Sequence, residues 1–273
     1  MANDPVTTPL ELDDTWAYGK GTLHGGWLLE TLTAHALQHT AHPHPLAVSG
    51  HYAAAPHLGT AELTVEALRE GRSVASLRTA LAQQGRTKLS ALVTAGTLPA
   101  AASRPLLVDG AAPVLPAPER CPRHEAPPDQ PRNGITEQLE VRLDPASAPW
   151  LDGAPGGRPL VAGWVRSATG RPVDPLLLLS VLDALPPVTP GLGIAGWVPT
   201  IELTAYLRCQ PVDGWLAVVQ RARLLHGGWL EEDCDVWDAA GNLVAQSRQL
   251  AGYREPVRSS GDPSRAAAPQ PPA

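Results

Sequence analysis

The feature that most constrains this chain is an internal repeat. Residues 67–96 align with residues 223–252 without a gap, and both segments alternate apolar and polar residues as β-strands do. Three pairs of turn glycines share one offset of 156 positions (227−71, 241−85 and 252−96): Gly71 with Gly227, Gly85 with Gly241, and Gly96 with Gly252. This spacing indicates a duplication, so the chain is expected to fold as two copies of one unit.

A helix is expected ahead of the main run of four strands in each copy. In the second copy it covers residues 174–185: Asp174 and Pro175 favour a helix start, residues 176–182 are apolar on nearly every side, and prolines follow at 186 and 187. A helix without a polar face is a buried one. In the first copy the helix follows Gly25-Gly26 and covers 27–37. One helix followed by antiparallel strands predicts an α+β fold.

The strands and the domain boundaries follow from the same periodicity. Strands are expected at 47–54, 61–69, 74–83 and 88–96, and again at 136–143, 157–167, 200–208, 215–225, 230–238 and 243–253. Residues 1–10 are expected to be loose, and a proline-rich stretch separates the copies as an extended linker. The predicted division is a first unit at 11–98, a linker at 99–134, a second unit at 135–255 and a disordered tail at 256–273.

Composition excludes several classes of function. A net charge of −6 gives no basic surface for nucleic acid. The three cysteines have no CxxC spacing, which argues against disulfides and a structural zinc site and fits a reducing compartment. No segment approaches the roughly 18 apolar residues of a membrane span, and the N-terminus lacks signal-peptide features. A cytoplasmic protein without metal or cofactor is expected; His35 and His39 are four apart, but no HExxH motif or nearby carboxylate supports a metal.

Asp183 is the anomaly of the buried helix. It lies in the last turn, where the helix dipole disfavours negative charge. A carboxylate on such an element costs free energy unless something compensates it. Either the helix end reaches solvent, or Asp183 has a function.

Comparing the two copies isolates a candidate trio. Offsets of 150 (183−33), 155 (204−49) and 156 (249−93) set three residues of the second copy against three of the first: Asp183 against Thr33, Thr204 against Ser49, and Gln249 against Val93. A carboxylate, a hydroxyl and an amide could hold one water molecule, with the carboxylate as base. The alternative for Thr204 and Gln249 is that they are ordinary strand residues facing solvent.

The ordered motifs of both halves resemble those of the acyl-CoA thioesterase II family, the double-hotdog thioesterases. The likeness rests on these segments: His24-Gly25-Gly26, Ser49-Gly50-His51, residues 65–73, 201–208 and 242–249, and the helix ending in Asp183. It implies a double hotdog, two tandem units in which a sheet wraps a helix, packed as a pseudo-dimer. It also implies hydrolysis of acyl-CoA by water held by an Asp, a Thr or Ser, and a Gln, which by position are Asp183, Thr204 and Gln249.

Four further residues are candidates for substrate binding. Backbone N–H groups of Gly25 and Gly26 could hold the thioester carbonyl oxygen, although a tight structural turn explains them equally well. Arg72, in a hairpin, could contact CoA phosphates, whereas hairpin arginines are usually solvated. His51 could pair with a carboxylate if the protein were a hotdog enoyl-CoA hydratase or dehydratase.

Two alternatives to hydrolysis therefore stay open: the hydratase or dehydratase, and a non-catalytic acyl-thioester binding protein. A serine thioesterase is not supported, because the chain has no GxSxG motif. The sequence leaves open the acyl chain and whether CoA or an acyl carrier protein is bound. Exposed sheet edges could pair copies of the chain, so a homo-oligomer also stays open.

Overall fold

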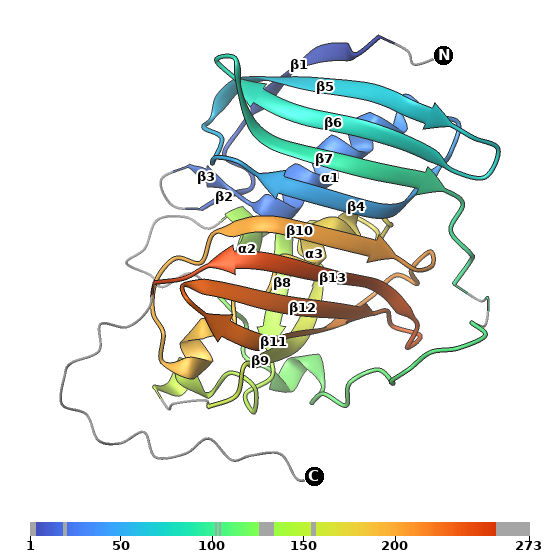
Figure 1. Ribbon diagram of the computed structural model, residues 1–273. Coiled ribbons are helices and arrows are strands. Elements are labelled where there is room, and N and C mark those ends of the chain that lie inside the picture. Colours follow the sequence, from blue (N-terminus) through green and yellow to red (C-terminus); the bar gives the residue numbers. More distant parts are fainter. Residues whose placement is uncertain are drawn as a thin grey trace.

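The computed structural model describes residues 4–18, 21–101, 103, 105–125, 134–153 and 157–254. Within them, eleven strands form one antiparallel sheet in the order β1-β5-β6-β7-β4-β10-β13-β12-β11-β9-β8 (Figure 1). The strand bounds are β1 Val6–Leu12, β4 His44–Tyr52, β5 Gly59–Glu70, β6 Ala75–Gln83, β7 Arg86–Gly96, β8 Leu139–Leu143, β9 Leu160–Ser167, β10 Thr200–Leu207, β11 Leu216–His226, β12 Trp229–Trp237 and β13 Leu243–Gly252. Two short strands, β2 (Ala17–Tyr18) and β3 (Thr22–Leu23), pair separately. The expected tail at 256–273 lies outside the described residues.

The sheet joins the two copies edge to edge. The first copy contributes the five strands from β1 to β4 in the sheet order, and the second contributes the six from β10 to β8. Strands β4 and β10 pair antiparallel at the centre, with Ser49 opposite Thr204. This arrangement confirms the predicted α+β double hotdog.

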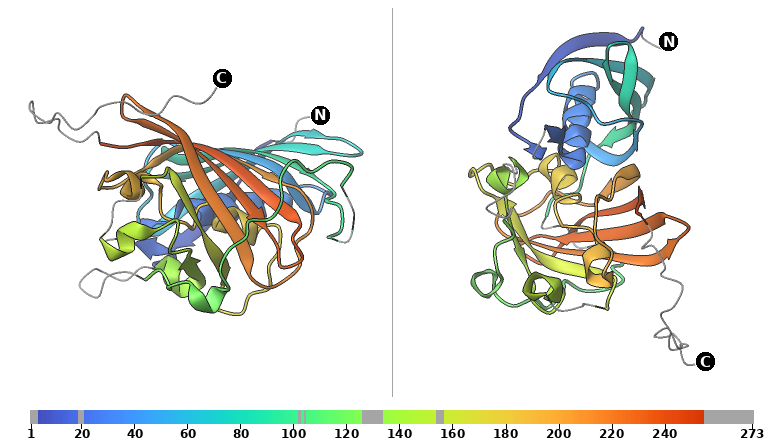
Figure 2. Two further views of the ribbon diagram at one scale, coloured as in Figure 1. Left: turned by 90° about the horizontal axis from the view of Figure 1, so that it is seen from below. Right: turned by 90° about the vertical axis from the view of Figure 1, so that its left-hand side faces the viewer.

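The helices lie against the sheet and between its two halves (Figures 1 and 2). Their bounds are α1 Gly25–Leu37, α2 Gly134–Gln138 and α3 Leu177–Val181, with 3₁₀ turns η1 Pro118–Arg120, η2 Pro149–Asp152 and η3 Thr189–Leu192. Helix α1 contacts α3 and strands β4 to β7. Leu29, Leu32, Leu178 and Leu179 are fully buried in one apolar core that spans both copies. Among the described residues, none of these helices has the length and apolar character needed to cross a membrane.

Three elements differ from the sequence-based expectation. Residues 6–12 form β1 rather than a loose start; Pro9 argues against a strand, but β1 is an edge strand, where proline is tolerated. Residues 136–138 belong to α2 rather than to a strand. The helix expected over 174–185 is regular only over Leu177–Val181, because the following turns use 3₁₀-type bonds such as Asp183 N–H to Ser180 O (3.3 Å).

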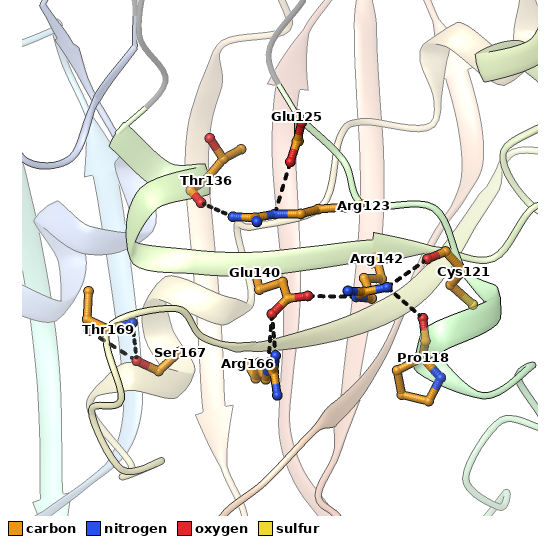
Figure 3. A network of polar contacts seen from close by, with 10 residues as sticks. All are labelled: Pro118, Cys121, Arg123, Glu125, Thr136, Glu140, Arg142, Arg166, Ser167 and Thr169. Atoms are coloured by element: carbon orange, nitrogen blue, oxygen red, sulfur yellow. Dashed lines mark hydrogen bonds and ion pairs between the residues drawn. The ribbon is translucent and has the colours of Figure 1, made fainter.

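Part of the expected linker is bound to the second copy. The His124 N–H donates to Val141 O (2.8 Å) and the Leu143 N–H donates to Pro122 O (3.1 Å), so this segment covers the outer edge of β8. Figure 3 shows how Arg142 fastens it, with Nη1 donating to the carbonyl oxygens of Pro118 (3.2 Å) and Cys121 (3.4 Å). The buried Glu140 carboxylate accepts from Arg142 and from Arg166 in the same network.

Candidate active site

A cavity of about 1080 Å³ opens where the two copies meet. Residues of both copies line it, and His124 and Glu125 of the linker add to its wall. Polar side chains in its wall include those of Tyr52 from β4 and, from the second copy, Asp183, Thr200, Gln220 and Gln249. A cavity of about this size at the interface of two units is a usual location for a ligand.

Asp183 follows α3 and points at the first turn of α1. Its Oδ2 accepts a 2.7 Å hydrogen bond from the Gly26 N–H. Burial raises the pKa of the Asp183 carboxyl, and the nearby His24 and the Gly26 N–H partly oppose that rise. The positive end of the α1 dipole therefore faces the carboxylate, which offsets the unfavourable end of its own helix. A carboxylate whose pKa is raised by burial, while nearby donors stabilise its charged form, is suited to act as a base.

Gly25 and Gly26 allow this approach because they have no side chain. A Cβ on Gly25 would lie 2.9 Å from Asp183 Oδ2, and one on Gly26 would lie 2.8 Å from the Leu179 carbonyl oxygen. Both glycines are thus required for the close contact between α1 and α3. The Gly26 N–H serves the carboxylate, not a ligand, whereas Gly25 lines the cavity.

His24 caps α1 and contacts the same aspartate. Its Nδ1 accepts from the Trp27 N–H (3.2 Å), which leaves Nε2 to bear the proton in the neutral ring. Nε2 lies 2.8 Å from the Asp183 carbonyl oxygen and 3.3 Å from Oδ2. The imidazole is fully buried and stacks on Trp16, with ring centroids 5.8 Å apart. His24 therefore holds the Asp183 backbone and carboxylate in place.

Gln249 and Thr200 form the second polar group of the cavity. Gln249 lies on β13, and its Oε1 accepts from the Thr200 hydroxyl at 2.8 Å. Thr200 begins β10, and the register of β10 against β13 shifts between Thr200 and Glu202. This β-bulge directs Thr200 and Ile201 toward the cavity, as bulges beside active sites often do.

Thr204, the hydroxyl predicted from the sequence, does not lie in this group. It is not among the described residues that line the cavity. Its hydroxyl donates to Ser49 Oγ (2.9 Å) and to Glu202 Oε1 (2.5 Å). The physical reason is strand alternation: Leu203, opposite Gln249, faces inward, so Thr204 faces the other side of the sheet. The β10 hydroxyl that lines the cavity is that of Thr200, which regular alternation would put on the same outer face as Thr204.

The predicted substrate-binding residues fall in different places. Gly25 lines the cavity and Gly26 holds Asp183, as described above. His51 is exposed, on the face of β4 opposite to that of the cavity residue Tyr52, and it does not line the cavity. Its cross-strand neighbour on β10 is Glu202, but no hydrogen bond or ion pair joins the two among the described residues. Arg72 lies in the hairpin after β5, at the opposite end of that strand from the cavity residue Pro56.

Tyr52 is a further cavity residue, for which the sequence pattern predicted no role. Its hydroxyl donates to the Gly25 carbonyl oxygen at 3.0 Å. Burial, together with the carboxylates of Asp183 and Glu202, holds the pKa of Tyr52 well above its usual value, so the phenol stays protonated. The sequence feature that could have pointed to Tyr52 is its position directly after the segment Ser49-Gly50-His51.

The internal comparison at an offset of 150 has a structural counterpart. Asp174 accepts from the Leu177 N–H (2.7 Å) at the start of the second helix, as His24 accepts from the Trp27 N–H at the start of the first. Those pairs are 150 positions apart (174−24 and 177−27), as are Asp183 and Thr33. Thr33 donates only to Leu29 O within α1. The two copies thus share a helix start, and the carboxylate is present in the second copy alone.

Comparisons with known proteins agree with this architecture. Residues 12–96 match the model of the acyl-CoA thioesterase N-terminal domain, and residues 118–253 match that of the acyl-CoA thioesterase C-terminal domain. An uncharacterised protein of Mycobacterium tuberculosis is 34% identical over 266 residues, covering 88% of this chain and 89% of that protein.

Two solved structures share the fold across nearly the whole chain. A proposed thioesterase II from Thermobifida fusca has a TM-score of 0.82 and 33% identity, covering 91% of this chain and 92% of that one. The acyl-CoA thioesterase II TesB2 from Mycobacterium marinum has a TM-score of 0.67 and 19% identity, covering 92% and 94%, and at that identity shows the fold alone. Because both domain models match in order over most of the sequence, this chain belongs to the acyl-CoA thioesterase family and is a thioester hydrolase.

Proposed function

We propose that the protein hydrolyses acyl-CoA by direct attack of a water molecule that Asp183 activates and that Thr200 and Gln249 position. The observation that supports this most strongly is that all three side chains line one cavity, where Thr200 and Gln249 are already hydrogen-bonded to each other. The carboxylate supplies a base, and the hydroxyl and the amide supply orientation.

The reaction balances with these groups alone. Asp183 takes a proton from water while the water oxygen bonds to the thioester carbonyl carbon. The tetrahedral intermediate then breaks its carbon–sulfur bond, and the leaving thiolate takes the proton from Asp183. The products are a carboxylic acid and the free thiol, and the carboxylate is regenerated.

The oxyanion of the intermediate needs a donor, and the Gly25 N–H fits that role. As the first N–H of α1 it has no acceptor within the helix, and among the hydrogen bonds of the described residues none uses it. Gly25 lines the cavity beside Asp183. A backbone donor at a helix start stabilises developing negative charge.

Two valine substitutions on one strand test the assignment. Thr200→Val removes the cavity hydroxyl, and Thr204→Val makes the same chemical change on the outer face of β10. Hydrolysis of acyl-CoAs from short to long chain is followed by thiol release. We expect Thr200→Val to lower kcat by about 10- to 100-fold and Asp183→Asn by about 10² to 10⁴, while Thr204→Val stays within twofold of native.

The same assays separate the alternatives. Equal losses in Thr200→Val and Thr204→Val, or full turnover in Asp183→Asn, would contradict the proposed site. Tight binding of acyl-CoA without turnover by the native protein would instead indicate a binding protein.

A further inference from the structure

Glu232 is a buried carboxylate directly behind the Gln249 amide. It lies on β12 opposite Gln249 on β13, and only 1% of its surface is exposed. The Gln249 Nε2 donates to Glu232 Oε2 at 2.5 Å. Glu232 does not line the cavity, and the Gln249 amide connects it to the cavity hydroxyl of Thr200.

Three groups around the Glu232 carboxylate donate hydrogen bonds to it. Its other oxygen, Oε1, accepts from the Val188 N–H at 2.8 Å, and the Gln220 amide also donates to it. Burial raises the pKa of Glu232, while these three donors oppose the rise. No arginine or lysine is paired with it among the described residues. The carboxylate is therefore satisfied by neutral donors. Two of them, Gln220 and Gln249, also line the cavity, and Gln249 is the one whose amide oxygen accepts from Thr200.

The first copy shows that the fold does not need this carboxylate. Val93 is the counterpart of Gln249, 156 positions earlier (249−93), and it pairs across β6 and β7 with Leu77. Leu77 and Val93 are both buried. The same offset sets Glu232 against Ser76 (232−156), so the first copy has no carboxylate at either position. Burying Glu232 and Gln249 costs desolvation energy that the apolar contact of Leu77 with Val93 avoids, which indicates a role other than stability.

The charge of Glu232 dictates the direction of the hydrogen bonds that follow. A carboxylate only accepts, so the Gln249 amide must present Nε2 to Glu232 and Oε1 to Thr200. The Thr200 hydroxyl must then donate its proton to Oε1 at 2.8 Å. Its oxygen is left to accept from a neighbouring water. A water that donates one hydrogen to Thr200 and the other to Asp183 has its lone pair free to attack.

We propose that Glu232 is a positioning residue for thioester hydrolysis, and that its carboxylate fixes the Gln249 amide so that Thr200 accepts a hydrogen bond from the attacking water. This inference rests on the proposed function of Asp183, Thr200 and Gln249. It adds a fourth side chain, which acts through Gln249 and touches neither substrate nor water.

The Glu232→Gln variant tests the donor–acceptor direction of the hydrogen bonds from residue 232 to Thr200, because glutamine has nearly the same shape as glutamate. Because the Val188 N–H requires an acceptor, the introduced amide would turn its oxygen to Val188 and its NH₂ group to Gln249. The Gln249 amide would then rotate and reverse the bond to Thr200. We expect kcat to fall about tenfold or more with KM nearly unchanged, because the defect concerns water and not substrate.

A double-mutant cycle distinguishes positioning from general structural damage. In a Gln249→Ala background, Glu232→Gln should change kcat by less than about twofold, because the residue through which it acts is gone. Glu140→Gln is the matched control: Glu140 is also a buried carboxylate of the second copy, but it is paired with Arg142 and Arg166 away from the cavity. It should leave kcat within twofold. An unchanged kcat in Glu232→Gln, or an equal loss with and without Gln249, overturns the proposal.

A measurement on the unreacted protein separates this proposal from the proposed function. A side-chain amide bonded to a carboxylate at 2.5 Å should give a proton resonance shifted strongly downfield in native protein, absent in Gln249→Ala and lost in Glu232→Gln. If native protein lacks that resonance, the contact and the proposal fail, even if no Glu232 variant folds. If the resonance is present but native protein has no turnover, the proposed function fails, and the role of Glu232 in hydrolysis fails with it.

Discussion

The Gly26 N–H and the Asp183 carboxylate lie 2.7 Å apart, although 157 residues separate them in the chain. One belongs to the first turn of α1 in the first copy, and the other follows α3 in the second copy. The candidate base therefore depends on both copies: the second supplies the carboxylate, and the first supplies the helix start that stabilises its charge.

Gly26→Ala should damage stability and activity together. The new Cβ would lie 2.8 Å from the Leu179 carbonyl oxygen, a backbone atom that cannot rotate away, so α1 and α3 must separate. We expect a loss of about 1–3 kcal/mol in the free energy of unfolding. A shift of about 1 Å at the carboxylate should lower kcat by about 10²-fold. Chemical denaturation and the thiol-release assay measure both effects.

Gly252→Ala is the control for this change. A Cβ at Gly252 would meet Pro199 at 3.8 Å, an ordinary contact. Its effect on unfolding should stay within about 0.5 kcal/mol. A loss at Gly252 as large as that at Gly26 would show that the close contact of α1 with α3 is not the cause.

Asp183→Asn should lower kcat by about 10² to 10⁴ yet stabilise the protein at neutral pH. Burial raises the pKa of Asp183 in the folded state, so folding favours the neutral carboxyl and opposes its ionisation. The folded state then binds more protons than the unfolded state, and stability falls as pH rises through the raised pKa. Asparagine removes this cost and can still accept from the Gly26 N–H. We expect a gain of about 1 kcal/mol at pH 7.

The gain should disappear in acid. Below about pH 4, the ordinary pKa of aspartate, the carboxyl is neutral in both folded and unfolded chains, so native protein and variant should be equally stable. Denaturant unfolding from pH 3.5 to pH 8 measures the difference. A gap between the two proteins that is constant with pH would show that the Asp183 charge is not its origin.

Much of the architecture could be predicted because it repeats in sequence. The turn glycines at one offset predicted two similar units, and the apolar helix around Leu178 predicted a buried element. Asp183 and Gln249 could be selected because their counterparts, Thr33 and Val93, are different kinds of residue. Local periodicity and self-comparison are enough for these conclusions, since neither requires knowledge of which strands pair.

Thr200 could not be found in this way. Regular alternation puts Thr200 and Thr204 on one face of β10, and only the bulge at Ile201 turns Thr200 inward. A bulge depends on the register against β13, which no spacing within β10 reveals. Thr204 was a misleading choice because Thr204 and its counterpart Ser49 are direct neighbours across β4 and β10, on the face away from the cavity. Self-comparison detects such pairs without showing which face they occupy.

Two substitutions of His24 should distinguish its role as the N-cap of α1 from its role in orienting Asp183. His24→Asn retains an acceptor for the Trp27 N–H but is too short to reach Asp183, whereas His24→Ala loses both contacts. We expect the alanine variant to be less stable than the asparagine variant by about 1 kcal/mol. Both should lower kcat by about 10- to 100-fold, because Asp183 loses the partner that orients it. Recovery of native kcat in His24→Asn would show that His24 acts only as a cap.

Arg171 forms ion pairs at the start of the second copy's helix, and breaking them should cost stability without loss of activity. Arg171 donates to the buried Glu30 at 2.5 Å and to Asp174 at 3.1 Å, and Ser180 donates to the other oxygen of Glu30. Arg171→Leu leaves the Glu30 carboxylate buried and short of a counter-charge. The expected loss is about 1–3 kcal/mol, reduced from the fully buried case because 36% of the Arg171 side chain is exposed.

A second substitution tests whether the loss of stability in Arg171→Leu comes from the unpaired charge of Glu30. Adding Glu30→Gln to Arg171→Leu removes that charge, so the double variant should regain part of the lost stability. Arg78→Leu breaks the more exposed Arg78–Glu66 pair and should cost less than about 1 kcal/mol. In all three variants kcat should stay within twofold of native, since Arg171, Glu30 and Arg78 do not line the cavity. A double variant that is less stable than Arg171→Leu alone would contradict this account of the pair.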